Sequence, residues 1–186
     1  FGSFTAAVTY ARKGHVFIGD MKWAIAFTFV GSGIGTLLVH YLASDVMTQV
    51  IPFLLVAAAL YFLFGPKIGE LDRHHYLERI PFYLIFGLTL GFYDGFFGPG
   101  TGSFWSLAFV ALLGFNMLKA TAHTKVVNFT SNFASFLFFA FAGHVVWLPA
   151  AVMALGQLLG ARLGANTAMK HGARIIKPLL VTVSLV

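Results

Sequence analysis

Apolar residues fill this chain in long blocks that short polar segments separate. The blocks at residues 23–43 and 46–64 are each long enough to cross a bilayer core of about 30 Å as a helix. Further helices are predicted at residues 119–142 and 149–165. Residues 1–11 resemble the end of a spanning helix, and residues from 175 onward the start of one. The pattern predicts an all-α polytopic membrane protein with one polar linker at residues 65–80.

One apolar block, at residues 81–115, is interrupted in its middle. The interruption contains Pro99 and five glycines: Gly91, Gly95, Gly98, Gly100 and Gly102. Glycine permits backbone angles that other residues avoid, and proline lacks an N–H group, so a continuous helix across residues 98–102 is improbable. Broken backbone at membrane depth is stable only where protein or a watery cavity satisfies its polar groups. We therefore predict a broken or re-entrant helix with halves of about 13 residues each, too short to span alone.

Three short matches relate the two halves of the chain. Gly14-His15-Val16 recurs 129 residues later at Gly143, Gly31-x-x-x-Gly35 recurs 125 residues later at Gly156, and Pro52 recurs 126 residues later at Pro178. Their common order predicts an internal repeat. Residues 1–64 would be the remainder of a first repeat, 65–80 a cytoplasmic linker and 81–186 a second repeat. Because the chain opens and closes inside apolar runs, an internal fragment is expected, with the first repeat's own break upstream of Phe1.

Composition supports the class of polytopic membrane proteins, and the positions of the charges predict which loops lie on the cytoplasmic side. Only 10% of residues are charged, against about 25% in soluble domains, and 59% are hydrophobic. The net charge of +6 is explained by cytoplasmic loops rich in Lys and Arg, without any nucleic-acid partner. A re-entrant hairpin at the break places all these loops on one side of the membrane. It also makes the two repeats inverted, an arrangement common among secondary transporters.

The glycine-rich break is a candidate anion site. Its residues are Gly98, Gly100, Thr101, Gly102 and Ser103. Free N–H groups at residues 100–103, the positive end of the following half-helix and two hydroxyl groups all favour an oxyanion. The segment lacks the Gly-Lys-Ser/Thr of a P-loop. The alternative is a kink that only eases helix packing.

A stripe of polar residues follows the break. Thr121, Lys125, Asn128, Asn132 and Ser135 recur at spacings of four, three, four and three, which places them on one face of a helix. Such a face is expected to line protein or a watery cavity rather than lipid. We predict substrate contact by Lys125, Asn128 and Asn132. The alternatives are a lysine that reaches the interface and asparagines that bond neighbouring helices.

Asp94 is the only acidic residue between residues 81 and 186. It is a candidate for coupling transport to protons, or else a structural cap or ion-pair partner. The histidines show no metal-ligand spacing, and the sequence has no cysteine, so neither a metal site nor a cofactor is predicted. The absence of a nucleophile–base pair indicates that the chain is not an enzyme.

These motifs resemble a known family. The segments GFYDGFFGPGTGSF (91–104), GFNMLKATAH (114–123) and KVVNFTSN (125–132) are similar to the second repeat of the TauE/SafE sulfite-exporter family. GPKIGE (65–70) and GQLLGAR (156–162) are similar to its YfcA-type branch. The resemblance implies a multi-pass permease of the bacterial inner membrane, with two related four-helix halves.

The resemblance also implies a substrate class, which is small sulfur-containing anions such as sulfite or organosulfonates. The expected partners are this anion and the lipid bilayer, and a homodimer is one option for the assembly. A non-transporting membrane scaffold, or a permease for a different small anion, is the alternative function.

Overall fold

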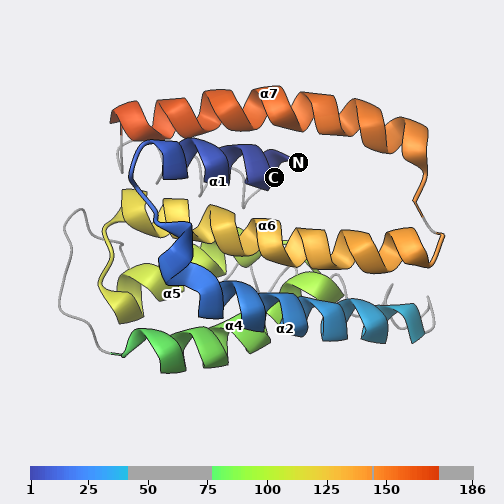
Figure 1. Ribbon diagram of the computed structural model, residues 1–186, viewed down its shortest axis with the longest axis horizontal. Coiled ribbons are helices and arrows are strands. Elements are labelled where there is room, and N and C mark those ends of the chain that lie inside the picture. The colour runs from blue at the N-terminus through green and yellow to red at the C-terminus, as the bar shows by residue number, and fades with distance from the viewer. Residues whose placement is uncertain (42–76, 144, 172–186) are drawn as a thin grey trace.

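The computed structural model describes residues 1–41, 77–143 and 145–171, and every regular element in these ranges is helical (Figure 1). The helices are α1 (Gly2–Arg12), η1 (Ile18–Met21), α2 (Lys22–Tyr41), α4 (Arg79–Phe96), α5 (Thr101–Leu113), α6 (Met117–Phe141) and α7 (Trp147–His171). Two of them, spanning Ile18–Tyr41 and Trp147–Lys170, are long and apolar enough to cross a membrane. The predicted helices at 46–64 and from 175, and nearly all of the predicted linker, lie outside the described residues.

The helix before the break is longer than the sequence suggested. We predicted a half of about 13 residues, but α4 has 18, or about 27 Å, and stays helical through Gly91 and Gly95. Both glycines pack against the backbone of α2: a Cβ atom at Gly91 would lie 2.7 Å from the carbonyl oxygen of Thr28, and one at Gly95 would overlap that of Ser32. In α4 these glycines therefore serve close helix packing, which favours small residues in membranes.

The break itself covers residues 97–100, so it overlaps the predicted 98–102 but ends earlier, because α5 is already helical from Thr101. Gly98 and Gly100 have φ angles of 87° and 82°, in the left-handed region that side chains disfavour, and Pro99 stands between them. The chain then reverses. The N–H of Leu77 donates to the carbonyl oxygen of Leu112 at 3.4 Å, and the ring of Phe82 packs 5.4 Å from that of Phe109. The start of α4 and the end of α5 therefore lie together, and the two helices form a hairpin.

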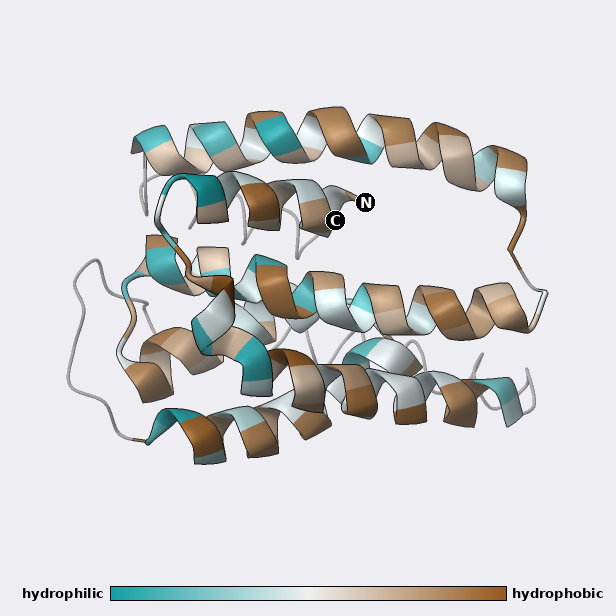
Figure 2. Cartoon of the chain, in the orientation of Figure 1, coloured by the Kyte–Doolittle hydropathy of each residue, from teal (hydrophilic) through white to brown (hydrophobic). Residues whose placement is uncertain are grey.

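The helices run in both directions along the long axis of the molecule. Figure 1 shows α1 running opposite to α6, and α2 running opposite to α7. As a consequence, basic residues collect at one end of the molecule: Arg12 ends α1, Lys22 begins α2, Arg79 begins α4, Lys119 lies in the first turn of α6, and Lys170 is near the end of α7. Figure 2 shows this end as the more hydrophilic one, while the long middle of the helices is mainly apolar.

Candidate functional site

A cavity of about 440 Å³ lies against the glycine-rich break, and we call it the break cavity. It is bounded by the end of α4, the start of α5, α6 and the side chain of Val39 in α2. Its lining includes the predicted site residues Asp94, Gly98, Gly100, Thr101, Gly102, Asn128 and Asn132, together with Ser135. Residues from three separate segments of sequence therefore share one cavity. Its volume falls within the range of small-molecule sites.

The backbone at the break offers hydrogen-bond donors, although fewer than predicted. The N–H of Thr101 bonds Gly98 O at 3.4 Å, and that of Ser103 bonds Gly100 O at 2.9 Å, so both are satisfied within the turn. Within the described residues, the N–H groups of Gly100 and Gly102 have no such partner. They stand at the first turn of α5, where the helix dipole is positive. The break can therefore supply two donors and a favourable field to an anion.

Asn128 adds a side-chain donor to the same wall. A Cβ atom on Gly102 would lie 2.9 Å from Asn128 Nδ2, so glycine is what lets the α5 backbone approach this amide. Asn128 Oδ1 is buried, and among the residues that the structure describes it has no hydrogen-bond partner. An amide oxygen accepts hydrogen bonds, so the unpaired Oδ1 suits a water molecule or a donor group and offers nothing to an anion. Only the Nδ2 group of Asn128 can donate to an anion in the break cavity that this residue lines.

Asp94 joins the three segments around the cavity. Its Oδ2 accepts a hydrogen bond from the hydroxyl of Ser131 in α6, and its side chain also interacts with Thr101 at the start of α5. Thr101 in turn donates to Gly98 O at 2.7 Å. No basic side chain makes an ion pair with Asp94 in the described part of the chain, which does not favour the ion-pair alternative. The carboxylate lies directly beside the predicted anion site.

A cluster of hydroxyl groups connects the cavity to α2. The hydroxyl of Ser135 lies 2.8 Å from that of Thr36 and 3.0 Å from that of Ser32. Ser32 also donates to Ser131 O at 2.8 Å, and Thr36 to Gly95 O at 3.1 Å. These bonds hold α2, α4 and α6 together behind Asp94. We did not single out Ser32 and Thr36 from the sequence, although their spacing of four within an apolar, glycine-rich helix was a usable signal.

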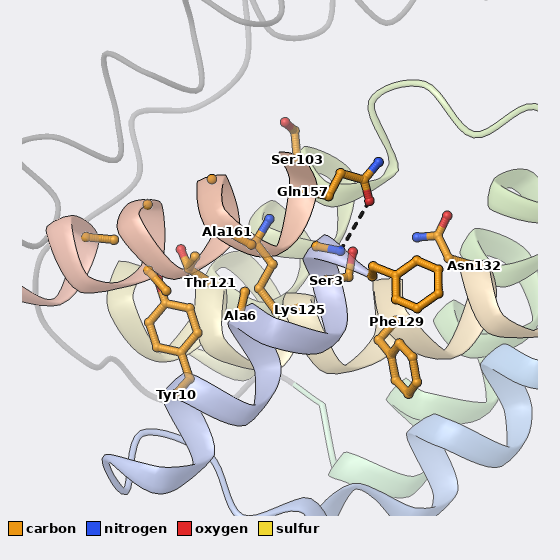
Figure 3. Close-up of a pocket in the computed structure, with 16 residues that line it drawn as sticks. Ser3, Ala6, Tyr10, Ser103, Thr121, Lys125, Phe129, Asn132, Gln157 and Ala161 are labelled. Carbon is orange, nitrogen blue, oxygen red and sulfur yellow. Dashed lines mark hydrogen bonds between the residues drawn. The ribbon is translucent and has the colours of Figure 1, made fainter. Parts of the chain in front are cut away.

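The remaining predicted residues face a second cavity of about 730 Å³, which we call the α1–α7 cavity (Figure 3). Lys125 and Ser103 line it, together with Thr121 and residues of α1 and α7. Figure 3 shows Lys125 extending from α6 with Ala6 of α1 and Ala161 of α7 beside it. Within the described ranges, the ammonium group of Lys125 has no hydrogen-bond or ion-pair partner. Asn132 lines both cavities and so marks their boundary.

The structure therefore divides the predicted site in two. Seven of its nine residues meet at the break cavity, and Lys125 and Ser103 lie on the other side of the contact between α5 and α6. That contact includes the hydroxyl pair of Ser106 and Thr124 at 3.2 Å. The part of the chain that the structure describes holds no group of three or more His, Cys, Asp or Glu residues suited to a metal ion.

Comparison with known proteins decides the family. The model of the sulfite exporter TauE/SafE family matches residues 1–186. The chain belongs to the TauE/SafE family. It is 49% identical over 185 residues to the probable membrane transporter protein YfcA of Escherichia coli K12, and the match covers 100% of this chain and 69% of that protein.

Other relatives of this TauE/SafE protein carry similar names. The probable membrane transporter protein ORF9 of Sinorhizobium sp is 48% identical over 185 residues, covering 100% of this chain and 71% of the relative. A probable membrane transporter protein of Haemophilus influenzae is 46% identical over 183 residues, covering 98% and 72%. No solved structure matches the chain. Family membership and the apolar helices together make the chain a membrane transporter protein.

Proposed function

We propose that this TauE/SafE protein is part of a secondary permease that moves small sulfur-containing anions of the sulfite or organosulfonate class across the bacterial inner membrane. The observation that carries the proposal is the break cavity, which is lined by Gly100 and Gly102, whose N–H groups have no described partner, and by Asn128, whose Nδ2 group can donate. These are neutral donors at a positive helix end, the kind of environment that binds oxyanions in proteins. The sulfur-containing substrate class is inferred from the sulfite exporter TauE/SafE family, to which the chain belongs.

Uptake into vesicles tests this function. Full-length protein is reconstituted, and labelled sulfite, a short alkyl sulfonate and thiosulfate are compared with phosphate and chloride. We expect saturable uptake of at least one sulfur anion that the unlabelled anion inhibits. Uptake of phosphate or chloride alone would contradict the substrate class, and uptake of none of the five would favour a scaffold.

The same proposal assigns the α4–α5 hairpin a re-entrant path and the two halves of the chain an inverted topology. The basic residues at one end of the helices support it, since Lys and Arg are enriched on the cytoplasmic side. In this arrangement the break lies within the membrane, where its unpaired N–H groups are satisfied by a watery cavity or a bound anion. Both ends of the hairpin then lie in the cytoplasm.

Labelling with an impermeant thiol reagent tests the hairpin. Single replacements Lys67→Cys, outside the described residues, and Lys119→Cys are expected to react from the cytoplasmic side, because both flank the same hairpin. Gly143→Cys, after the end of α6, is the matched control and should react only from the opposite side. Reaction of the Lys67→Cys and Lys119→Cys proteins from opposite sides would mean that the hairpin crosses the membrane.

Lys125 is assigned to the substrate path through the α1–α7 cavity. Lys125→Ala is expected to weaken anion binding about 10- to 100-fold while the protein stays folded, because a hydrogen bond to a charged group contributes about 1.5–3 kcal/mol. Lys125→Arg should retain part of the affinity. Arg162→Ala is the matched control, since Arg162 is exposed on α7 and does not line either cavity. Binding is measured by isothermal titration calorimetry, and unchanged affinity of the Lys125→Ala protein would return this lysine to an interfacial role.

A further inference from the structure

The turn between α4 and α5 is held in shape through its carbonyl oxygens. The oxygen of Gly98 accepts a hydrogen bond from the N–H of Thr101 at 3.4 Å and another from the Thr101 hydroxyl at 2.7 Å. The oxygen of Gly100 accepts from the N–H groups of Ser103 at 2.9 Å and Phe104 at 3.2 Å. In both cases the donor lies three or four residues further along the chain, so the start of α5 itself supplies these bonds.

The carbonyl oxygen of Pro99 is held differently, by a side chain of α4. The hydroxyl of Tyr93 donates to it at 2.9 Å. The ring of Tyr93 packs 5.6 Å from that of Phe97 in the break and 5.5 Å from that of Phe104 in α5, measured between ring centroids. The main-chain oxygen of Tyr93 also accepts the N–H groups of Phe97 and Gly98. Tyr93 therefore contacts the end of α4, the break and α5 at once.

Holding the oxygen of Pro99 also sets the direction of the next N–H group. In a planar trans peptide, the C=O and N–H bonds point in opposite directions. Since the C=O of Pro99 points to the hydroxyl of Tyr93, the N–H of Gly100 points away from Tyr93. Gly100 lines the break cavity and Tyr93 does not. The N–H of Gly100 is also one of the two at the break without a partner among the described residues.

The local backbone does not select this orientation by itself. If the peptide between Pro99 and Gly100 turned over, the φ angle of Gly100 would change sign from its present 82°. Glycine tolerates both signs of φ, so the flipped turn is open to the chain. The flipped peptide would direct a carbonyl oxygen where the N–H now points, and a carbonyl oxygen repels an anion. A tertiary contact must therefore hold the peptide, and the bond from Tyr93 is that contact.

We infer that Tyr93 is a positioning residue for anion binding, whose hydroxyl keeps the Pro99–Gly100 peptide turned so that the Gly100 N–H is presented to the break cavity. Tyr93 does not touch the anion and acts only through this peptide. The inference deepens the function proposed above and rests on it, because it requires an anion in the break cavity. Two consecutive residues of α4 then serve one site, since Asp94 lines the cavity and Tyr93 orients the turn beside it.

Tyr93→Phe in the full-length protein tests the inference. The change removes the hydroxyl and keeps the ring between Phe97 and Phe104, so the protein should stay folded. We expect its affinity for methanesulfonate and sulfite, measured by isothermal titration calorimetry, to fall about 2- to 10-fold, the effect of losing one neutral hydrogen bond. Thr89→Val is the matched control. Its hydroxyl donates to Ile85 O within α4, one turn before Tyr93, and its removal should leave the affinity unchanged.

NMR spectroscopy reports on the peptide itself, with or without an anion. Pro99–Gly100 is the only Pro-Gly pair in the 186 residues, so ¹³C-carbonyl proline combined with ¹⁵N-glycine selects this peptide in an HNCO spectrum. Gly100→Ala removes the signal and thereby assigns it. We expect Tyr93→Phe to shift the carbonyl resonance before any anion is added. Methanesulfonate should shift the N–H resonance of the unmodified protein more than that of the Tyr93→Phe protein. General destabilisation would not single out this one peptide.

The outcomes separate the inference from the proposed function. An unchanged carbonyl resonance in the Tyr93→Phe protein would overturn the inference, and so would a shifted resonance with undiminished affinity. An equal loss of affinity in the Thr89→Val protein would also overturn it. Each of these results leaves anion binding by the unmodified protein intact. Binding of neither anion by the unmodified protein would remove the proposed function and the anion role of Tyr93 with it, while the carbonyl resonance would still decide whether Tyr93 orients the peptide.

Discussion

Replacing Gly95 by alanine is expected to destabilise the protein by about 3 kcal/mol, the upper part of the range for overpacked cores. Helix propensity alone predicts the opposite, a gain of about 1 kcal/mol, because glycine is a poor helix former. Packing decides the sign, since the new Cβ atom would overlap the backbone of Ser32 in α2. Backbone atoms of a packed helix cannot rotate aside, so α2 and α4 must separate. The separation would also strain the bond from Thr36 to Gly95 O that lies behind the break cavity.

Gly33→Ala is the matched control for this experiment. Its Cβ atom would lie 2.8 Å from the ring of Phe138, the far end of a side chain that can turn away. Melting temperatures of the two variants in detergent, followed by size-exclusion chromatography after heating, should therefore differ clearly. Equal stability of the Gly95→Ala protein and the unmodified protein would show that α2 and α4 are packed less closely than the structure indicates.

The same glycines show why only part of the fold could be predicted. Gly98, Pro99 and Gly100 break the helix through their own backbone preferences, and these can be read from the sequence. Gly91 and Gly95 have the same local preferences, yet they stay helical because α2 lies against them. That contact joins residues about 60 positions apart. A local pattern cannot say which glycine ends a helix and which allows a neighbour to approach.

The candidate site, too, could be predicted from the sequence only in part. The spacing of Thr121, Lys125, Asn128 and Asn132 correctly places them along one side of α6, where all four line a cavity. Periodicity does not reveal that α5 docks on this face and separates Lys125 from Asn128. The docking depends on Gly102 and on the Ser106–Thr124 pair, which are tertiary contacts. The sequence also did not reveal how many of the N–H groups at residues 100–103 are free. The turn itself satisfies two of these four, those of Thr101 and Ser103.

The position of Asp94 gives a physical reason for coupling anion transport to protons. A carboxylate beside the break repels an anion in the same cavity, so anion binding favours the protonated acid. An anion and a proton would then occupy the site together. The alternative remains a structural role, since Asp94 accepts from Ser131 and so links α4 to α6. Asparagine at position 94 distinguishes the two roles, because its amide can accept a hydrogen bond but cannot take up a proton.

Asp94→Asn is therefore expected to abolish accumulation driven by a pH gradient while anion-for-anion exchange continues. The amide oxygen can still accept a hydrogen bond from Ser131, although a weaker one than a carboxylate accepts, and the side chain no longer takes up a proton. Both transport modes are measured in vesicles, with melting temperature as the check on folding.

Ser131→Ala is the matched variant, because it removes the donor and leaves the carboxylate able to take up a proton. Under coupling, Ser131→Ala keeps gradient-driven transport and Asp94→Asn does not. Under a purely structural role, both variants lose stability and impair both modes alike, since each weakens the same bond between α4 and α6. Full gradient-driven accumulation by the Asp94→Asn protein would contradict coupling through this residue and assign the proton to another group.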